Sequence, residues 1–267
     1  MIILEDKCTG CNLCIPYCPT SAIIEDPAKG TVTILEGECA ECGVCYRSEV
    51  CAVKAIYPQD LEWPRTLRAE FSDVAMPYVS PIFQHRRGYV KDDMDRRQRL
   101  NLKEAERRVS GRGTAEMKNN DVTGRFKRGY CGIGIEVGRG CGGARFRDVE
   151  KLTTSLAKLG IEFEQDNPTY HLLADPKTGK MLPDILNEKI LSCIIEFSIS
   201  LKRLPEIIDC VKKTSRELEC AFSLCLISCL EEDGSDPVKE TALKLGLPVS
   251  INGKVNVGLG RPLAEVD

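Results

Sequence analysis

Histidine, tryptophan and long apolar runs are scarce in this chain of 267 residues. Its two histidines, His85 and His171, lie in unrelated contexts, and we expect each to make surface or polar contacts rather than to act as a general base. The chain has no G-x-S-x-G elbow, H-E-x-x-H helix or P-loop. The carboxylates are scattered along charged faces. Conventional hydrolytic catalysis therefore finds no support in the sequence.

No apolar run reaches the roughly 18 residues that a membrane span needs, and no signal-peptide pattern precedes the first cysteines. The composition, 42% hydrophobic and 29% charged, is ordinary for a globular protein. We therefore expect a soluble, cytoplasmic protein without a membrane partner. Its length suits two domains, or one large domain with a small appendage.

Cysteine, by contrast, is abundant, with 15 residues in the chain. The first sixty residues hold two groups of four: Cys8, Cys11, Cys14 and Cys18, then Cys39, Cys42, Cys45 and Cys51. The first group has the spacing C-x2-C-x2-C-x3-C followed by Pro19, which is the run of bacterial-type ferredoxins. A tight loop with this spacing brings three thiolates onto one volume, as a cubane cluster requires. The sequence therefore predicts iron–sulfur centres.

In two-cluster proteins with this run, the fourth cysteine ligates the other cluster. We therefore predict two [4Fe-4S] clusters with crossed ligand sets. These are Cys8, Cys11, Cys14 and Cys51 for the first cluster, and Cys39, Cys42, Cys45 and Cys18 for the second. The alternatives are a disulfide framework, which a reducing cytoplasm disfavours, and zinc ribbons, which show two separated cysteine pairs rather than repeated triplets.

The two cysteine groups also form an internal repeat, because KCTGCNLCIPYCPTSAI recurs as ECAECGVCYRSEVCAVKAI. Residues 1–60 closely resemble the 2[4Fe-4S] ferredoxins. This resemblance implies a pseudo-two-fold pair of short hairpins and helical turns, and strongly reducing centres. The second half departs from the family pattern: five residues instead of three separate Cys45 from Cys51, and Ala52 replaces the usual proline. We interpret this as an enlarged loop beside the first cluster.

Charge is distributed unevenly along the chain. Residues 1–60 carry nine acidic and four basic side chains, residues 61–128 carry ten and sixteen, and residues 129–267 carry twenty-one and seventeen. We interpret residues 61–128 as a basic, irregular linker with one charged helix, DDMDRRQRLNLKEAERRV. It is either solvated or an arm that packs on the acidic ferredoxin or on a partner subunit. The anchors of such an arm would be Trp63, Phe71, Tyr78 and Phe83. Acidic residues interrupt the basic ones, so nucleic-acid binding is the least favoured interpretation.

Residues 129–267 regain clear periodicity. CGIGIEV predicts a strand, RDVEKLTTSLAKLG a helix ending on Gly160, and IEFEQDNPTYHLLAD a strand or hairpin that turns at residues 166–168. EKILSCIIEFSISL predicts a long strand, LPEIIDCVKKTSREL a helix and ECAFSLCLISCL an apolar strand. This order is βαββαβ, so the predicted fold class is α+β. The C-terminal domain would have ferredoxin-like, ACT-like topology, with two helices on one face of a four-stranded antiparallel sheet. A further helix is predicted near residues 237–245, and a final strand or hairpin in VSINGKVNVGL.

The stretch IEVGRGCGGARFRD offers a second candidate site. Gly138, Gly140 and Gly143 form a G-x-G-x-x-G pattern between a strand and a helix, the context of a dinucleotide fingerprint. A hairpin follows where a second βαβ unit should be, so a packing role for the glycines is favoured over flavin or nucleotide binding. Arg139, Arg145 and Arg147 leave a generic anion site open. A third metal site would rest on Cys131 and Cys141, and we expect Cys193, Cys225 and Cys229 to be buried on strands.

These features favour low-potential electron transfer by a ferredoxin-type subunit of a larger anaerobic oxidoreductase, with the C-terminal domain as its docking platform. Such a chain would be an electron carrier more than a catalyst by itself. One alternative is an iron–sulfur flavoreductase acting on a small aromatic or heterocyclic substrate. Another is a redox-linked regulatory module that senses a small molecule and forms a homo-oligomer through its C-terminal domain. An acidic ferredoxin should dock a basic surface of its partner.

Overall fold

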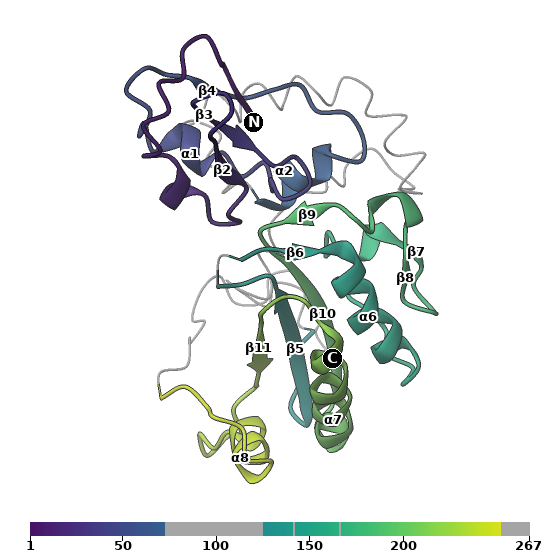
Figure 1. The fold of residues 1–267 in the computed structure, drawn as a ribbon. Coiled ribbons are helices and arrows are strands. Elements are labelled where there is room, and N and C mark those ends of the chain that lie inside the picture. Colours follow the sequence, from purple (N-terminus) through teal and green to yellow (C-terminus); the bar gives the residue numbers. More distant parts are fainter. Residues whose placement is uncertain (73–124, 141, 166, 252–267) are drawn as a thin grey trace.

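The computed structural model describes residues 1–72, 125–140, 142–165 and 167–251 (Figure 1). The predicted charged helix, Tyr78, Phe83, Cys141 and most of the predicted final hairpin lie outside these residues. Within them the chain has mixed helix and sheet content, with five small antiparallel sheets. No helix in this part of the chain is long and apolar enough to cross a membrane.

The N-terminal part (residues 1–60), which we call the ferredoxin unit after the resemblance of its sequence, contains two antiparallel strand pairs. Strand β1 (Ile2–Ile3) pairs with β4 (Ile56–Tyr57), and β2 (Ile23–Asp26) pairs with β3 (Thr31–Ile34). A 3-10 helix at Ile15–Tyr17 follows the third cysteine, Cys14, whereas helix α1 (Val44–Arg47) includes the third cysteine of the second half, Cys45. Each half of the repeat thus forms one short helix, which is a 3-10 helix in the first half and an α-helix in the second.

The C-terminal unit (residues 125–251) is built on a three-stranded sheet in the order β10-β5-β11. Strand β5 (Tyr130–Val137) is central, between β10 (Cys193–Ser200) and β11 (Phe222–Ile227). Helices α6 (Phe146–Ala157) and α7 (Leu204–Thr214) lie together beside this sheet (Figure 1). Large and small residues alternate along β5: Ile133 and Ile135 are fully buried, and glycines occupy positions 132 and 134.

The predicted four-stranded sheet needs a correction in the described residues. The predicted second strand is reduced to an isolated bridge between Phe163 and Phe197, next to the edge strand β10. The predicted hairpin over residues 161–175 does not form either. A 3-10 helix at Tyr170–Leu172 interrupts it, and β7 (Leu173–Asp175) instead pairs with β8 (Lys180–Met181) across the next turn.

The predicted long strand over residues 188–201 is also divided. It forms β9 (Lys189–Ile190), which pairs with β6 (Ala144–Arg145), and then β10, which pairs with β5. The chain changes partner between the two, and no local pattern encodes such a change. The predicted last helix is α8 (Pro237–Lys244), and the side chain of its N-cap residue, Asp236, accepts a hydrogen bond from Lys239 N.

The segment that follows the ferredoxin unit forms helix α2 (Thr66–Ser72). Leu67 and Phe71 of this helix are almost completely buried in the core of the C-terminal unit. Trp63 packs against the same core and donates a hydrogen bond from its indole to Asp184. Two of the four predicted anchors therefore contact the C-terminal unit of the same chain, and α2 lies between the two units in Figure 1.

Candidate metal centres

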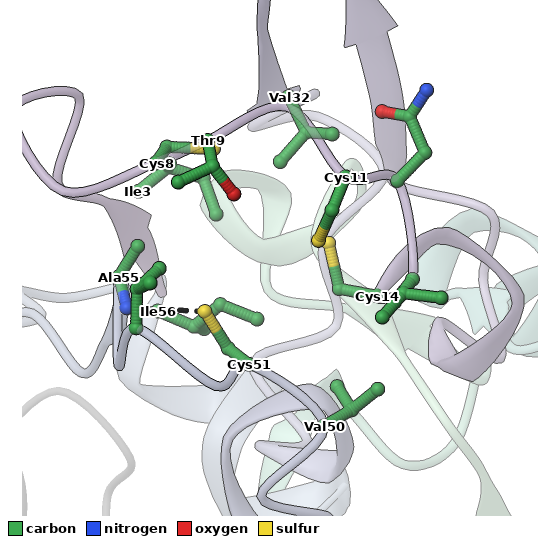
Figure 2. Close-up of a pocket in the computed structure, with 13 residues that line it drawn as sticks. Ile3, Cys8, Thr9, Cys11, Cys14, Val32, Val50, Cys51, Ala55 and Ile56 are labelled. Atoms are coloured by element: carbon green, nitrogen blue, oxygen red, sulfur yellow. Dashed lines mark hydrogen bonds between the residues drawn. The ribbon is translucent and has the colours of Figure 1, made fainter.

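The eight N-terminal cysteines line two separate pockets. Cys8, Cys11, Cys14 and Cys51 line the first, together with apolar side chains that include Val32. In Figure 2 the labelled cysteines of this set lie around a common space. The second pocket is lined by Cys18, Cys39, Cys42 and Cys45. Each pocket thus takes three cysteines from one half of the repeat and one from the other half.

Backbone conformation repeats together with the cysteines. Equivalent positions in the two halves share a positive φ: Gly10 and Glu41, Asn12 and Gly43, Ser21 and Lys54. A side chain rarely adopts this left-handed conformation without a structural reason. Alternation of right- and left-handed residues turns successive N–H groups into a concavity, as in many iron–sulfur sites. Gly10 is further required because a Cβ there would lie 2.3 Å from the carbonyl oxygen of Gly30.

The fourth cysteine of each half accepts a backbone hydrogen bond at its sulfur. Ala22 N donates to Cys18 Sγ at 3.1 Å, and Ala55 N donates to Cys51 Sγ at 3.2 Å. Both donors lie four residues after the cysteine, so the two contacts are equivalent under the repeat. Hydrogen bonds to ligand sulfurs are one of the means by which a protein adjusts a cluster's reduction potential.

The two pockets differ in exposure. Cys14, Cys39, Cys42 and Cys45 are buried, whereas Cys11 is exposed. Burial raises the pKa of Cys39 to about 11 and that of Cys45 to about 12. A thiol held neutral by burial releases its proton when a metal binds, because a metal ligand must be a thiolate.

Electrostatic repulsion between thiolates, which raises their pKa, acts within the same two sets of cysteines that line the two pockets. Burial is the main cause of the raised pKa of Cys14, and repulsion from Cys11, Cys51 and Cys8 adds to it. For Cys45 the repelling thiolates are those of Cys42, Cys39 and Cys18. Each set is therefore close enough in space for its members to interact electrostatically.

A single metal ion would need the thiols closer together. In the described residues, no group of three or more histidine, cysteine or acidic side chains is close enough together to hold one metal ion. A cubane differs from a single ion because each thiolate binds a different iron, with the cluster occupying the space between them. The donor set of each pocket, four thiols that line one space, fits such a cluster.

The remaining cysteines have varied environments. Cys131 and Cys193 are buried in the core of the C-terminal unit, as expected for Cys193. Cys229 is half-buried and its Sγ lies 2.9 Å from the carbonyl oxygen of Phe126. The expected burial of Cys225 is wrong, because β11 is an edge strand and turns this side chain to solvent. The suggested third metal site depends on Cys141, outside the described residues, and stays a prediction.

The glycine-rich loop between β5 and β6 has a packing explanation. A Cβ on Gly138 would lie 2.5 Å from the carbonyl oxygen of Leu191, and one on Gly143 would lie 2.7 Å from that of Ile190. Gly140, in contrast, has open space around it. Two of the three glycines thus allow the loop to approach the β9 segment closely. Flavin or nucleotide binding at this loop stays a prediction.

The three arginines proposed for an anion site all contact carboxylates. The Nε atom of Arg139 lies 3.2 Å from Oε2 of Glu136. The Nη2 atom of Arg145 lies 2.5 Å from Oε1 of Glu38. Arg147 pairs with Glu219, also at 2.5 Å. Each of these cations already has an anionic partner within the chain, which weakens the argument for a free anion at this place.

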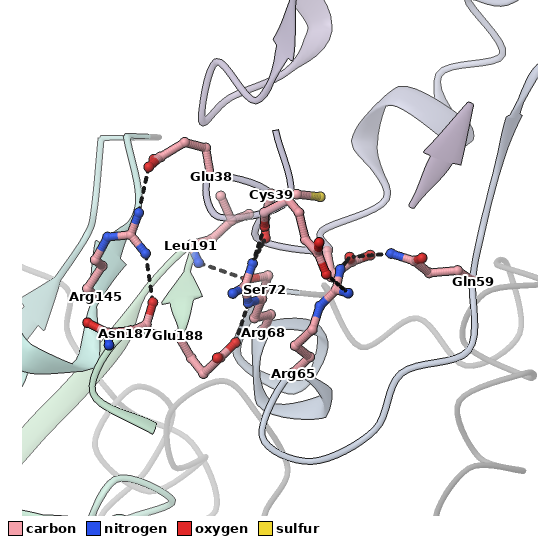
Figure 3. A network of polar contacts seen from close by, with 12 residues as sticks. Glu38, Cys39, Gln59, Arg65, Arg68, Ser72, Arg145, Asn187, Glu188 and Leu191 are labelled. Atoms are coloured by element: carbon pink, nitrogen blue, oxygen red, sulfur yellow. Dashed lines mark hydrogen bonds and ion pairs between the residues drawn. The ribbon is translucent and has the colours of Figure 1, made fainter. Parts of the chain in front are cut away.

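Sequence reasoning missed a polar network between the two units (Figure 3). Glu41, which lies between Cys39 and Cys42, is 1% exposed and accepts a 2.9 Å hydrogen bond from Arg65. Arg68 of α2, 6% exposed, donates a 3.0 Å hydrogen bond to the carbonyl oxygen of Cys39. An arginine pair spaced by three residues directly after an acidic ferredoxin was the only signal in the sequence.

The start of the chain matches a known protein family. Residues 1–24, which include Cys8, Cys11, Cys14 and Cys18, match the model of the 4Fe-4S binding domain. Searches of curated proteins and of solved structures found no match. The first four cysteines and the paired strands around them agree with this family. The N-terminal segment of this chain is therefore a ferredoxin-type segment that binds a 4Fe-4S cluster.

Proposed function

We propose that this chain carries electrons, one at a time, through two [4Fe-4S] clusters between a low-potential donor and a partner oxidoreductase. The observation that carries the proposal is the presence of two pockets, each lined by four cysteines. The ligands would be Cys8, Cys11, Cys14 and Cys51 for the first cluster and Cys39, Cys42, Cys45 and Cys18 for the second. A bound cluster would supply one-electron redox chemistry, with the added charge spread over its irons.

The exposure of the first pocket supports a role in exchange with a partner. Leu13 and Val53 line this pocket and are 58% and 42% exposed. Cys11, which also lines this pocket, is itself exposed. A cluster beside such a surface would be reachable by a docking protein, and the exposed apolar side chains would contact it.

The second pocket lies on the side of the ferredoxin unit that faces the C-terminal unit. Thr20 lines this pocket, and its methyl carbon would lie 3.3 Å from a Cβ placed on Gly143. Arg68, which is partly anchored in the C-terminal unit through Glu188, contacts the Cys39 carbonyl group. We propose that the first cluster exchanges electrons with the partner, while the C-terminal unit shields the second.

We further propose that the C-terminal unit is a docking platform of ferredoxin-like βαββαβ topology. Its strand order and the bridge at Phe163 support this topology. The acidic ferredoxin unit would dock a basic surface of the partner in a reducing, anaerobic cytoplasm. Association with the partner should accordingly be faster at low salt than at high salt. A rate of association that is indifferent to salt would contradict the electrostatic part of the proposal.

The first experiment is analysis of iron, acid-labile sulfide and organic cofactor in one anaerobically purified sample. Two [4Fe-4S] clusters require about eight irons and about eight sulfides per chain. This content without flavin supports the electron carrier. About four irons would contradict the second cluster, and a stoichiometric flavin would instead support the flavoreductase.

A further inference from the structure

The loop at residues 36–41, which leads into the second cysteine group, is surrounded by cations from outside the ferredoxin unit. Arg65 pairs with Glu36 and Glu41. From the C-terminal unit, Arg145 and Lys189 both pair with Glu38 at 2.5 Å. From within the ferredoxin unit, the N-terminal amine of Met1 also pairs with Glu41. Each of these cations has a carboxylate of the ferredoxin unit as its partner.

Arg68 differs from these cations because its contacts inside the ferredoxin unit are backbone carbonyls. Its Nη1 donates to the carbonyl oxygens of Glu36 and Cys39, the latter at 3.0 Å. Its Nε donates to Glu188 of the C-terminal unit (Figure 3). The guanidinium therefore joins a carboxylate of one unit to the backbone of a cysteine that lines the second pocket in the other.

The pair of Arg68 and Glu188 is also well shielded from water. The two side chains are 7% and 10% exposed. Water screens charges weakly in such surroundings, so each charge acts over a longer distance than at the surface. Reduction adds negative charge to an iron–sulfur cluster, and the net charge around a cluster is one determinant of its potential. A cation beside Cys39 favours the reduced state, whereas the carboxylate of Glu188 opposes it.

We propose that Arg68 and Glu188 set the reduction potential of the second cluster in opposite directions. They act as positioning and charge-supplying residues, since neither lines the pocket. The C-terminal unit, which supplies Glu188, is thereby coupled electrostatically to the second cluster. A partner that altered this contact would change the cluster's potential without touching a cysteine. The inference rests on the proposed function, because it requires two clusters.

The test uses the full chain with both clusters loaded. EPR-monitored potentiometric titration gives both potentials in one sample, so the first cluster is an internal reference. Arg68→Gln should lower the potential of the second cluster and Glu188→Gln should raise it. We expect each to change the equilibrium between oxidised and reduced forms at least tenfold, about 59 mV for one electron. The double variant, which removes the pair as a whole, should lie between the two single variants.

Matched controls come from the far end of the C-terminal unit. Arg128 and Glu232 form an exposed pair at 3.1 Å, so Arg128→Gln and Glu232→Gln change the same charges away from the clusters. Both should leave the two potentials unchanged. Arg68→Lys retains the charge and should keep the second potential near that of the native protein, which loss of packing alone would not predict.

Two results would overturn the inference. One is a shift of the second potential in the same direction in Arg68→Gln and Glu188→Gln. The other is an unchanged potential of the second cluster in Glu188→Gln. This second result tests the inference even if Arg68→Gln fails to fold. Iron and sulfide are measured on every sample. If the native protein holds a single cluster, the proposed function fails; if it holds two whose potentials do not move as stated, only this inference fails.

Discussion

The ring of Phe71 meets the ring of Phe146 edge to face, with centroids 5.4 Å apart and planes at 87°. Phe71 belongs to α2, directly after the ferredoxin unit, and Phe146 begins α6 of the C-terminal unit. Both side chains are at most 1% exposed. The connection between the units is therefore part of the larger hydrophobic core.

Replacing Phe71 by alanine should destabilise the C-terminal unit by about 3–5 kcal/mol, because it removes a buried ring and leaves a cavity. Urea denaturation followed by circular dichroism measures this change. Tyr130→Ala is the control, since Tyr130 is 49% exposed and its loss should cost much less. Equal effects of the two substitutions would contradict the role of α2 in the core.

Serine in place of Cys11 or Cys42 should each remove one cluster. Iron should fall from about eight to about four per chain in either variant, because the two cysteines line different pockets. EPR of the reduced protein identifies the cluster that remains, and the two variants should leave different signals. Cys225→Ser, at an exposed cysteine of β11, should retain all the iron. Loss of both clusters in each single variant would argue against two independent ligand sets.

Alkaline pH should destabilise the C-terminal unit through its buried thiols. Burial raises the pKa of Cys131 to about 12, from 9.0 for a free thiol. The unfolded chain therefore loses this proton at lower pH than the folded chain does. The resulting stabilisation is complete below pH 9 and declines as the pH rises from 9 towards 12. Burial raises the pKa of Cys193 as well, so this thiol acts in the same direction.

The measurement is the free energy of unfolding at pH 8 and pH 10 in the native chain and in Cys131→Val. The variant lacks one of the buried thiols and should lose less stability between the two pH values. Cys225→Ser should retain the native pH dependence. An identical decline in Cys131→Val and the native chain would show that this thiol does not contribute.

Gly143→Ala should destabilise the contact between the glycine-rich loop and β9. The φ of Gly143 is +73° and a Cβ there would lie 2.7 Å from the Ile190 carbonyl oxygen, so we expect a cost above about 1 kcal/mol. Gly142→Ala is the matched control, because its Cβ would meet nothing within 4 Å. Thermal denaturation compares the two variants. A Gly143→Ala protein as stable as Gly142→Ala would contradict the packing role.

The sequence by itself determined the chemistry of the N-terminal segment. Cysteine spacing is a local property, and a loop of fixed length can place its thiols in only a few ways. The same holds for β5, α6 and α7, whose hydrophobic periodicity predicted them within a few residues. Periodicity works for α6 and α7 because one face of each helix is buried, and for β5 because its apolar side chains alternate with glycine and glutamate.

Only the tertiary structure decided what depends on partners distant in sequence. It divided one predicted strand into β9 and β10, exposed Cys225 on an edge and reduced the second predicted strand to a bridge at Phe163. It also placed Arg68 between Glu188 and the Cys39 carbonyl group. Arg68 and Glu188, which form this ion pair, are 120 positions apart in the sequence. A local pattern cannot encode such contacts, because they depend on how the finished units pack against each other.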